Sequence, residues 1–193
     1  MRLSKLSFSN LAKINGSVSC LVDELRRKGL KIVLTSGSYD LFHVGHAQYL
    51  NKAKDCGDVL IVGLDSDEKI KKRKGPDRPI VSEEERAAIL SFVRPVDFII
   101  IKDVEDEPMG LIKTIKPDVL VVSETTKHDE KKLGKMLHFC ESVVILEAQS
   151  TTSTTAKVRR LFVDGAGKFA KDLTPQIENL IQEALHNFQK EGK

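Results

Sequence analysis

The chain has 193 residues, of which 40% are hydrophobic and 31% charged, and its formal net charge is +3. This length suits one domain with a substantial core, and so small a net charge does not by itself indicate nucleic-acid binding. No apolar run is long enough to span a membrane, the amino-terminal segment lacks the apolar centre of a secretory signal, and three scattered cysteines indicate reduced thiols rather than disulfides or a zinc cluster. We therefore expect a cytoplasmic globular protein without a membrane partner.

The first predicted element is a helix over Ser17–Lys28, and Gly29 is well placed to end it. Short β-branched runs then alternate with longer amphipathic segments. The runs are apolar throughout, which is typical of strands buried on both faces of a parallel sheet. This alternation predicts an α/β protein with a Rossmann-like, doubly wound, five-stranded parallel sheet and an added C-terminal helix. The predicted strands are Lys31–Thr35, Val59–Leu64, Phe98–Lys102, Val119–Ser123 and Val143–Glu147, and the predicted helices between them are Gly45–Cys56, Ser82–Val93, Pro108–Lys116 and His128–Glu141.

Beyond the last strand, a glycine- and lysine-rich segment, Asp164–Lys171, predicts a linker to a final helix. That helix is expected over Thr174–Gln189, with Thr174 as its cap and Pro175 at its first position. The sequence leaves open whether it packs on its own sheet or on a partner subunit. We thus divide the chain into a helical lead-in at residues 1–30, a main domain at residues 31–163, and a linker with the C-terminal helix at residues 164–193.

The segment TSGSYDLFHVGHAQYL, residues 35–50, carries the clearest chemical signal. It starts where the first strand ends and runs directly into a helix, whose unpaired N–H groups suit a phosphate. His43 and His46 are three residues apart and would share one face of the first helical turn. Gly45 removes a side chain that would crowd a bound group, and Gly37 allows a tight turn close to a ligand. Two imidazole donors at this point can stabilise charge on a phosphoryl group during its transfer.

Three plainer interpretations compete with this one. A single core histidine is commoner than a catalytic one, but here two histidines flank a glycine at a strand–helix turn. Zinc binding is disfavoured because the motif contains no Glu and no third ligand follows nearby. Helix capping would account for Ser38 or Asp40 but not for the histidines. Asp40 would then either hold the turn through backbone N–H groups or orient a histidine.

Basic and hydroxyl side chains elsewhere fit the same chemistry. Lys69–Arg78, KIKKRKGPDR, holds six basic residues and is either a solvated loop or a mobile clamp for a polyanion. Asp67 is expected to cap the short helix that leads to the lysines. Arg86 follows a capping box that begins at Ser82, and a bound phosphate would offset the cost of its charge near that helix start. Ser153–Thr155 precede another helical pattern and could cap it, bind phosphate, or do both.

Together these motifs resemble those of the cytidylyltransferase-like nucleotidyltransferases. HVGH at residues 43–46 is similar to the HxGH signature of that family, and STT at residues 153–155 is similar to its hydroxyl-rich motif after the fifth strand. The resemblance covers residues 31–161, which is most of the chain. Within the family, KGPDRP at residues 74–79 looks most like the heptose-1-phosphate adenylyltransferase domain.

The resemblance implies transfer of a nucleoside monophosphate from ATP or CTP to a phosphorylated sugar or polyol, with release of pyrophosphate. The phosphate oxygen of the acceptor is the nucleophile in such enzymes, so no side-chain nucleophile is required. Mg²⁺ is expected as the cofactor, held mainly by the NTP phosphates and not by a metal site of the protein. The resemblance assigns catalysis to His43, His46, Lys71 and Lys74. It assigns phosphate and nucleotide binding to Ser36, Gly37, Ser38, Tyr39, Asp40, Gly45, Arg86, Ser153, Thr154 and Thr155, and the acceptor or base pocket to Asp67, Ser123 and Glu124.

Adenylyl transfer of the ADP-heptose type is the leading interpretation, and relatives suggest a homodimer. The alternatives are a glycerol-3-phosphate-type cytidylyltransferase, an FMN adenylyltransferase, and a nucleotide-binding protein that has lost turnover. A nucleic-acid partner for the basic segment is not expected, because aromatic residues do not interleave with it. Binding to DNA that falls steeply with salt would reveal such a partner.

Overall fold

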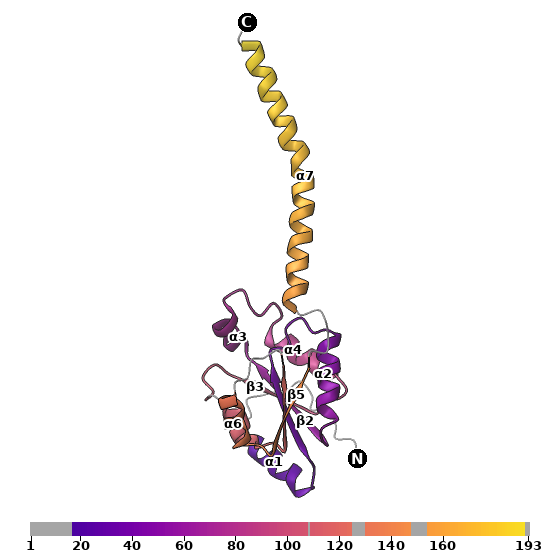
Figure 1. The fold of residues 1–193 in the computed structure, drawn as a ribbon, viewed down its shortest axis with the longest axis vertical. Coiled ribbons are helices and arrows are strands. Elements are labelled where there is room, and N and C mark those ends of the chain that lie inside the picture. The colour runs from indigo at the N-terminus through magenta and orange to yellow at the C-terminus, as the bar shows by residue number, and fades with distance from the viewer. Residues whose placement is uncertain (1–16, 108, 125–129, 148–153, 192–193) are drawn as a thin grey trace. The chain divides into compact units, whose positions relative to one another are not determined.

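A computed structural model describes residues 17–107, 109–124, 130–147 and 154–191. The chain divides into two compact units, residues 1–151 and residues 152–193. The strands of the first unit are β1 Ile32–Gly37, β2 Val59–Asp65, β3 Phe98–Lys102, β4 Val119–Ser123 and β5 Ser142–Leu146. Its helices are α1 Ser17–Arg27, α2 Val44–Lys54, α3 Asp67–Lys74, α4 Glu83–Phe92, α5 Gly110–Ile115 and α6 Glu130–Leu137 (Figure 1).

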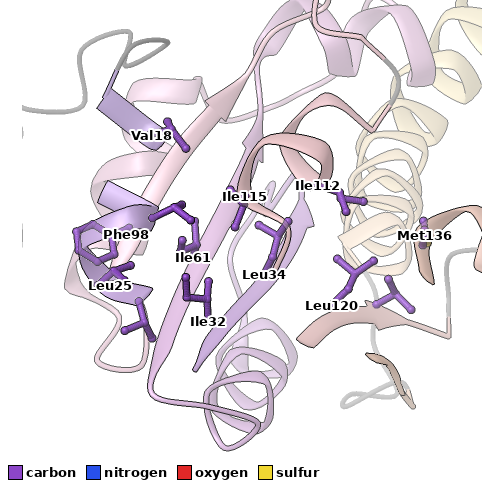
Figure 2. Packing of buried hydrophobic residues seen from close by; sticks show 13 residues of the cluster. Val18, Leu25, Ile32, Leu34, Ile61, Phe98, Ile112, Ile115, Leu120 and Met136 are labelled. Carbon is purple, nitrogen blue, oxygen red and sulfur yellow. The ribbon is translucent and has the colours of Figure 1, made fainter. Parts of the chain in front are cut away.

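The doubly wound parallel sheet expected from the sequence is confirmed. The strand order is β3-β2-β1-β4-β5, and each neighbouring pair is parallel. Because the order reverses at β1, right-handed crossovers place helices on both faces. One core cluster packs α1, α5 and α6 against the sheet, and Figure 2 shows its members around Leu34 of β1 and Ile61 of β2. A second cluster packs α2 and α4 on the opposite face.

The reversal of strand order falls between β1 and β4, and ligands of open α/β sheets bind beyond the carboxyl ends of the strands at such a point. Helix α2 is fixed to both strands by Tyr49. The Thr35 hydroxyl of β1 lies 2.8 Å from the Tyr49 hydroxyl, which in turn donates to the Val121 carbonyl of β4 at 3.2 Å. The fold therefore anchors α2, the helix that begins within the HVGH motif, beside the expected binding edge.

The second unit is helix α7, Thr154–Glu191. The predicted linker Asp164–Lys171 and the predicted cap at Thr174 are wrong, because one helix runs through both. Two glycines in the segment cost about 1 kcal/mol each relative to alanine, which weakens a helix without ending it. The Thr174 hydroxyl donates to the Ala170 carbonyl at 2.8 Å, a bond made inside a helix and not at its start. The division expected after residue 163 falls within α7.

Three further expectations concern the end of α1, the cysteines and membrane-spanning segments. Gly29 has a φ of 68°, the left-handed conformation that glycine adopts readily, and α1 ends before it as predicted. Cys20, Cys56 and Cys140 are free cysteines. Among the residues described, no helix combines the length and hydrophobicity needed to cross a bilayer.

Candidate active site

A left-handed turn, Gly37–Leu41, connects β1 to the HVGH motif. Tyr39 and Leu41 have φ values of 47° and 48°, which residues other than glycine adopt only where surrounding contacts hold the backbone. A Cβ atom on Gly37 would lie 3.0 Å from the Tyr39 ring, so glycine lets that ring fold back against the chain. Burial raises the pKa of Tyr39, which keeps its hydroxyl neutral. The turn is thus a constrained piece of backbone at the binding edge.

His43 has a structural task as well as the expected chemical one. Its Nδ1 accepts a hydrogen bond from the Gly45 N–H at 3.1 Å, so His43 is the N-cap of α2. Capping was predicted not to account for the histidines, and for His43 that prediction is wrong. Accepting this bond requires an unprotonated Nδ1, so the neutral ring carries its proton on Nε2. Nε2–H is therefore a donor whose orientation is set by the helix start.

His46 lies against His43 on the same face of the first turn, as the spacing predicts. The two ring centroids are 4.0 Å apart and the rings are stacked, with their planes inclined by 23°. The His46 ring also contacts Tyr39 edge to face and Phe42 at a tilt, each with centroids 5.5 Å apart. Both histidines are partly exposed. The rings of Tyr39 and Phe42 thus orient the His46 imidazole, and the capping bond orients that of His43.

The basic segment is helical as far as Lys74, where the sequence suggested a solvated loop or mobile clamp. Ser66 caps this helix, since its hydroxyl accepts from the Lys69 N–H at 3.2 Å, and the capping role expected for Asp67 is wrong. Lys71 is exposed one turn before the helix ends. Lys74 Nζ donates to the Ser38 hydroxyl at 3.2 Å. The basic helix therefore reaches the left-handed turn through its last lysine.

Lys74 also has an unusual electrostatic setting. Partial burial and the neighbouring positive charges of Arg73 and Arg78 lower its pKa, against the opposing effect of nearby carboxylates. A phosphate bound beside Lys74 would raise this pKa and favour the charged ammonium. Lys74 is thus suited to an anionic ligand at the turn.

Asp40 joins the left-handed turn to the segment after α3. Its buried carboxylate accepts from the N–H groups of Ile80 and Val81, each at 3.1 Å, and pairs with Arg78 Nη1 at 2.8 Å. Of the two expectations for Asp40, the structure favours bonding to backbone N–H groups, although these belong to a distant segment. Sequence reasoning missed Arg78 as the partner, because nothing local to KGPDRP indicates an acid 38 residues away.

Arg86 has a set of partners different from the phosphate expected for it. It is 1% exposed, and its Nη1 donates to the Ser38 carbonyl at 2.6 Å and to the Asp65 carbonyl at 2.9 Å. Its Nε donates to the Val81 carbonyl at 2.9 Å, and Nη2 pairs with the Asp67 carboxylate at 2.7 Å. That carboxylate, rather than a phosphate, offsets the charge near the start of α4. Direct phosphate contact does not fit a guanidinium so fully engaged by the protein.

Asp65, at the end of β2, was not singled out from the sequence. Its carboxylate is buried and pairs with Arg73 Nη2 and Lys102 Nζ, each at 2.9 Å. Burial alone would raise the pKa of Asp65, but Lys102 and Arg73 hold it below its ordinary value. The sequence signal that could have identified Asp65 is a carboxylate at the end of an otherwise apolar strand. This acid braces the basic helix against the sheet.

The remaining predicted residues lie at the same edge or outside the described part of the chain. Ser36 is exposed near the end of β1, and Ser123 ends β4, its parallel neighbour. The Glu124 N–H donates to the Leu146 carbonyl at 2.9 Å and thereby continues the sheet. Ser153 lies outside the described residues. Thr154 and Thr155 begin α7, but their side chains also lie outside the description.

The carboxylates near the turn do not fit a magnesium cage. Asp40, Asp65 and Asp67 each pair with an arginine, and Asp40 also accepts main-chain N–H groups. Within the described ranges, no group of three or more His, Cys, Asp and Glu side chains could hold a metal ion. A protein site for Mg²⁺ needs free carboxylate or carbonyl oxygens. The arrangement offers donors to an anion instead.

The sheet order and the flanking helices define a Rossmann-like, doubly wound α/β domain. The chain belongs to the cytidylyltransferase-like family, whose match covers residues 34–183. It is 41% identical over 143 residues to the bifunctional protein HldE of Wolinella succinogenes and 40% identical over 144 residues to that of Helicobacter pylori strain J99. These alignments cover 74% and 75% of this chain but 30% and 31% of the relatives. The chain thus spans about a third of the length of these curated relatives.

Two solved structures share the fold. The lipopolysaccharide core biosynthesis protein from Thermoplasma volcanium is 30% identical with a TM-score of 0.53, and the alignment covers 65% of this chain and all of that one. Pantoate-beta-alanine ligase from Francisella tularensis, solved with beta-gamma ATP and beta-alanine, is 16% identical with a TM-score of 0.50. That alignment covers 70% of this chain and 66% of the ligase, and this likeness concerns the fold alone.

Proposed function

We propose that this chain is a nucleotidyltransferase that moves the adenylyl group of ATP onto a heptose 1-phosphate and releases pyrophosphate. The observation that carries the proposal is the stacked pair of His43 and His46 at the N-terminus of α2, beside the reversal of strand order. Family membership and the HldE relatives support the reaction class. The resemblance of KGPDRP to the heptose-1-phosphate adenylyltransferase domain favours this pair of substrates over the alternatives.

The chemistry asked of the site is charge stabilisation. An oxygen of the acceptor phosphate attacks the α-phosphorus of ATP, and a new P–O bond forms as the bond to the bridging oxygen of pyrophosphate breaks. The electron pair of that bond leaves with pyrophosphate, so negative charge grows on the phosphoryl and leaving oxygens. His43 Nε2–H would donate to these oxygens, with the His46 imidazole beside it. No side chain needs to become covalently attached.

Repulsion between two phosphorylated reactants is the second difficulty, and cations at the turn oppose it. Lys74 already reaches Ser38, and Lys71 lies one helical turn earlier. Mg²⁺, when bound to the triphosphate oxygens, supplies further charge neutralisation. Because Asp40, Asp65 and Asp67 are engaged by arginines, the described side chains at the turn would contact the phosphates rather than the metal.

The test is pyrophosphate release from purified protein with Mg²⁺, each of ATP and CTP, and each of heptose 1-phosphate, glycerol 3-phosphate and FMN. We expect turnover with ATP and heptose 1-phosphate. Turnover only with CTP and glycerol 3-phosphate, or only with ATP and FMN, would establish the corresponding alternative. Nucleotide binding without turnover on any pair would establish an inert binding protein.

We also expect a homodimer, drawn from relatives. Sedimentation equilibrium should then give twice the chain mass of 21.5 kDa. A monomer at all concentrations would contradict that expectation without affecting the proposed reaction.

A further inference from the structure

We infer that Arg86 is a positioning residue that sets the conformation of the left-handed turn Gly37–Leu41, and that it does so through geometry more than through charge. The inference rests on the proposed function, because the turn is taken as the phosphate-binding backbone. Arg86 lies in the first turn of α4, yet its guanidinium bonds outside that helix. It joins the carbonyls of three separate segments, Ser38 of the turn, Asp65 at the end of β2 and Val81 before α4.

The bond to Ser38 acts on one peptide group of the turn. The Ser38 carbonyl belongs to the peptide that leads into Tyr39, the first residue with a positive φ. In a planar trans peptide the carbonyl and the following N–H point in opposite directions. By holding the Ser38 carbonyl, Arg86 aims the Tyr39 N–H away from itself. A residue in this strained conformation persists only where the surroundings hold it, and Arg86 supplies one such hold.

Val81, in the segment before α4, links the Arg86 guanidinium to Asp40 at the other end of the turn. Its N–H donates to Asp40, and its carbonyl accepts from Arg86 Nε. Ser38 is likewise held twice, by Arg86 at its carbonyl and by Lys74 at its hydroxyl. Displacing the guanidinium would therefore shift the turn, the segment before α4 and the Lys74 contact together.

Charge alone does not explain this arrangement. A guanidinium has five N–H groups in a planar fork, and four of its hydrogen bonds here reach three carbonyls and one carboxylate in different directions. A lysine ammonium keeps the charge and the Asp67 pair but presents its donors from a single nitrogen. It cannot reproduce the separate bonds to Ser38 and Val81. Arg86→Lys therefore separates a geometric role from an electrostatic one.

The experiment compares Arg86→Lys and Arg86→Met in the full chain, with kcat and KM for ATP measured by pyrophosphate release. A misplaced turn should lower kcat about 100-fold in both variants, while KM for ATP changes by less than about threefold. Arg26 gives a matched control, because it too is an arginine that donates to main-chain carbonyls of another segment. From α1, its Nη2 donates to the carbonyls of Ile115 and Lys116, at the end of α5, at 2.8 and 2.6 Å. Arg26→Lys and Arg26→Met should keep the wild-type kcat at temperatures where they are folded.

A second readout does not depend on turnover. Amide hydrogen exchange of residues 38–41 should quicken in Arg86→Lys and stay unchanged in Arg26→Lys. Wild-type kcat in Arg86→Lys, or a raised KM for ATP with kcat unchanged, would overturn the inference in favour of a charge or ligand role. Unchanged exchange at the turn would overturn it as well. If wild type turns over no substrate pair, the proposed function fails, and the exchange comparison still decides the positioning role.

Discussion

The imidazole rings of His43 and His46 lie face to face, with their centroids 4.0 Å apart. This stacking places two potential donors side by side at the start of α2, and only His43 also serves the helix as a cap. The two histidines therefore make different predictions.

His46→Ala should lower kcat by about 100- to 1,000-fold, the usual effect of removing one donor from a site that stabilises developing charge. Its partly exposed ring makes ring contacts but does not cap α2, so the urea midpoint should change little. Pyrophosphate release and urea unfolding measure the two quantities. A variant with wild-type kcat would remove His46 from the mechanism.

His43→Asn should separate capping from donation. Asparagine is a good N-cap residue, so the variant should keep the stability of wild type while losing the Nε2–H donor and most of kcat. His43→Ala loses both functions, and its free energy of unfolding should fall by about 1 kcal/mol in addition. An unfolding midpoint of His43→Ala equal to that of wild type would show that the bond from the Gly45 N–H contributes nothing to stability.

Lys74 should set the alkaline limit of kcat/KM for ATP, which reports ionisations of the free enzyme. Because burial and neighbouring arginines lower its pKa, the ammonium loses its proton, and its charge, at a lower pH than the ordinary 10.5. In Lys74→Arg the charge persists, so the alkaline limb should move to higher pH. Lys72→Arg, a change on the same helix, should leave the limb in place, and an unmoved limb in Lys74→Arg would contradict the assignment.

Tyr49→Phe removes the hydroxyl that bonds Thr35 and Val121, and should lower the free energy of unfolding by about 1 kcal/mol at neutral pH. Burial raises the pKa of Tyr49 to about 12 from an ordinary 10.0. The unfolded chain therefore ionises first as pH rises, and wild type loses stability through that interval. The difference in free energy of unfolding between wild type and Tyr49→Phe should therefore decrease as pH rises, as measured by urea titrations. A constant difference would mean that the hydroxyl titrates alike in both states.

The sheet could be predicted from the sequence because each buried strand has a local signature. The run Val59–Leu64 is apolar throughout, and all seven residues of β2 are buried. The histidine pair could be predicted for the same reason, since a spacing of three fixes a shared helical face. Such features can be predicted without knowing which residues distant in the sequence are in contact.

The partners of Arg86 and Asp40 could not be predicted in this way. Arg86 bonds Ser38 across 48 positions and Asp40 bonds Val81 across 41, and only the folded sheet brings these segments together. A phosphate was therefore the simplest partner that the sequence offered to an arginine at a helix start. The extent of α7 was predicted wrongly because local signals were given too much weight. Its glycines and Pro175 predicted a linker and a new helix start, but they lie within one continuous helix.

The capping bond of His43 has an evolutionary consequence. Drift toward an inert nucleotide binder could replace this ring only with a side chain that still caps α2. Substitutions that preserve the cap, such as asparagine, aspartate or serine, would be tolerated there more readily than alanine or leucine. Degenerate descendants of such a domain should thus keep a short polar side chain at this position long after the chemistry has gone.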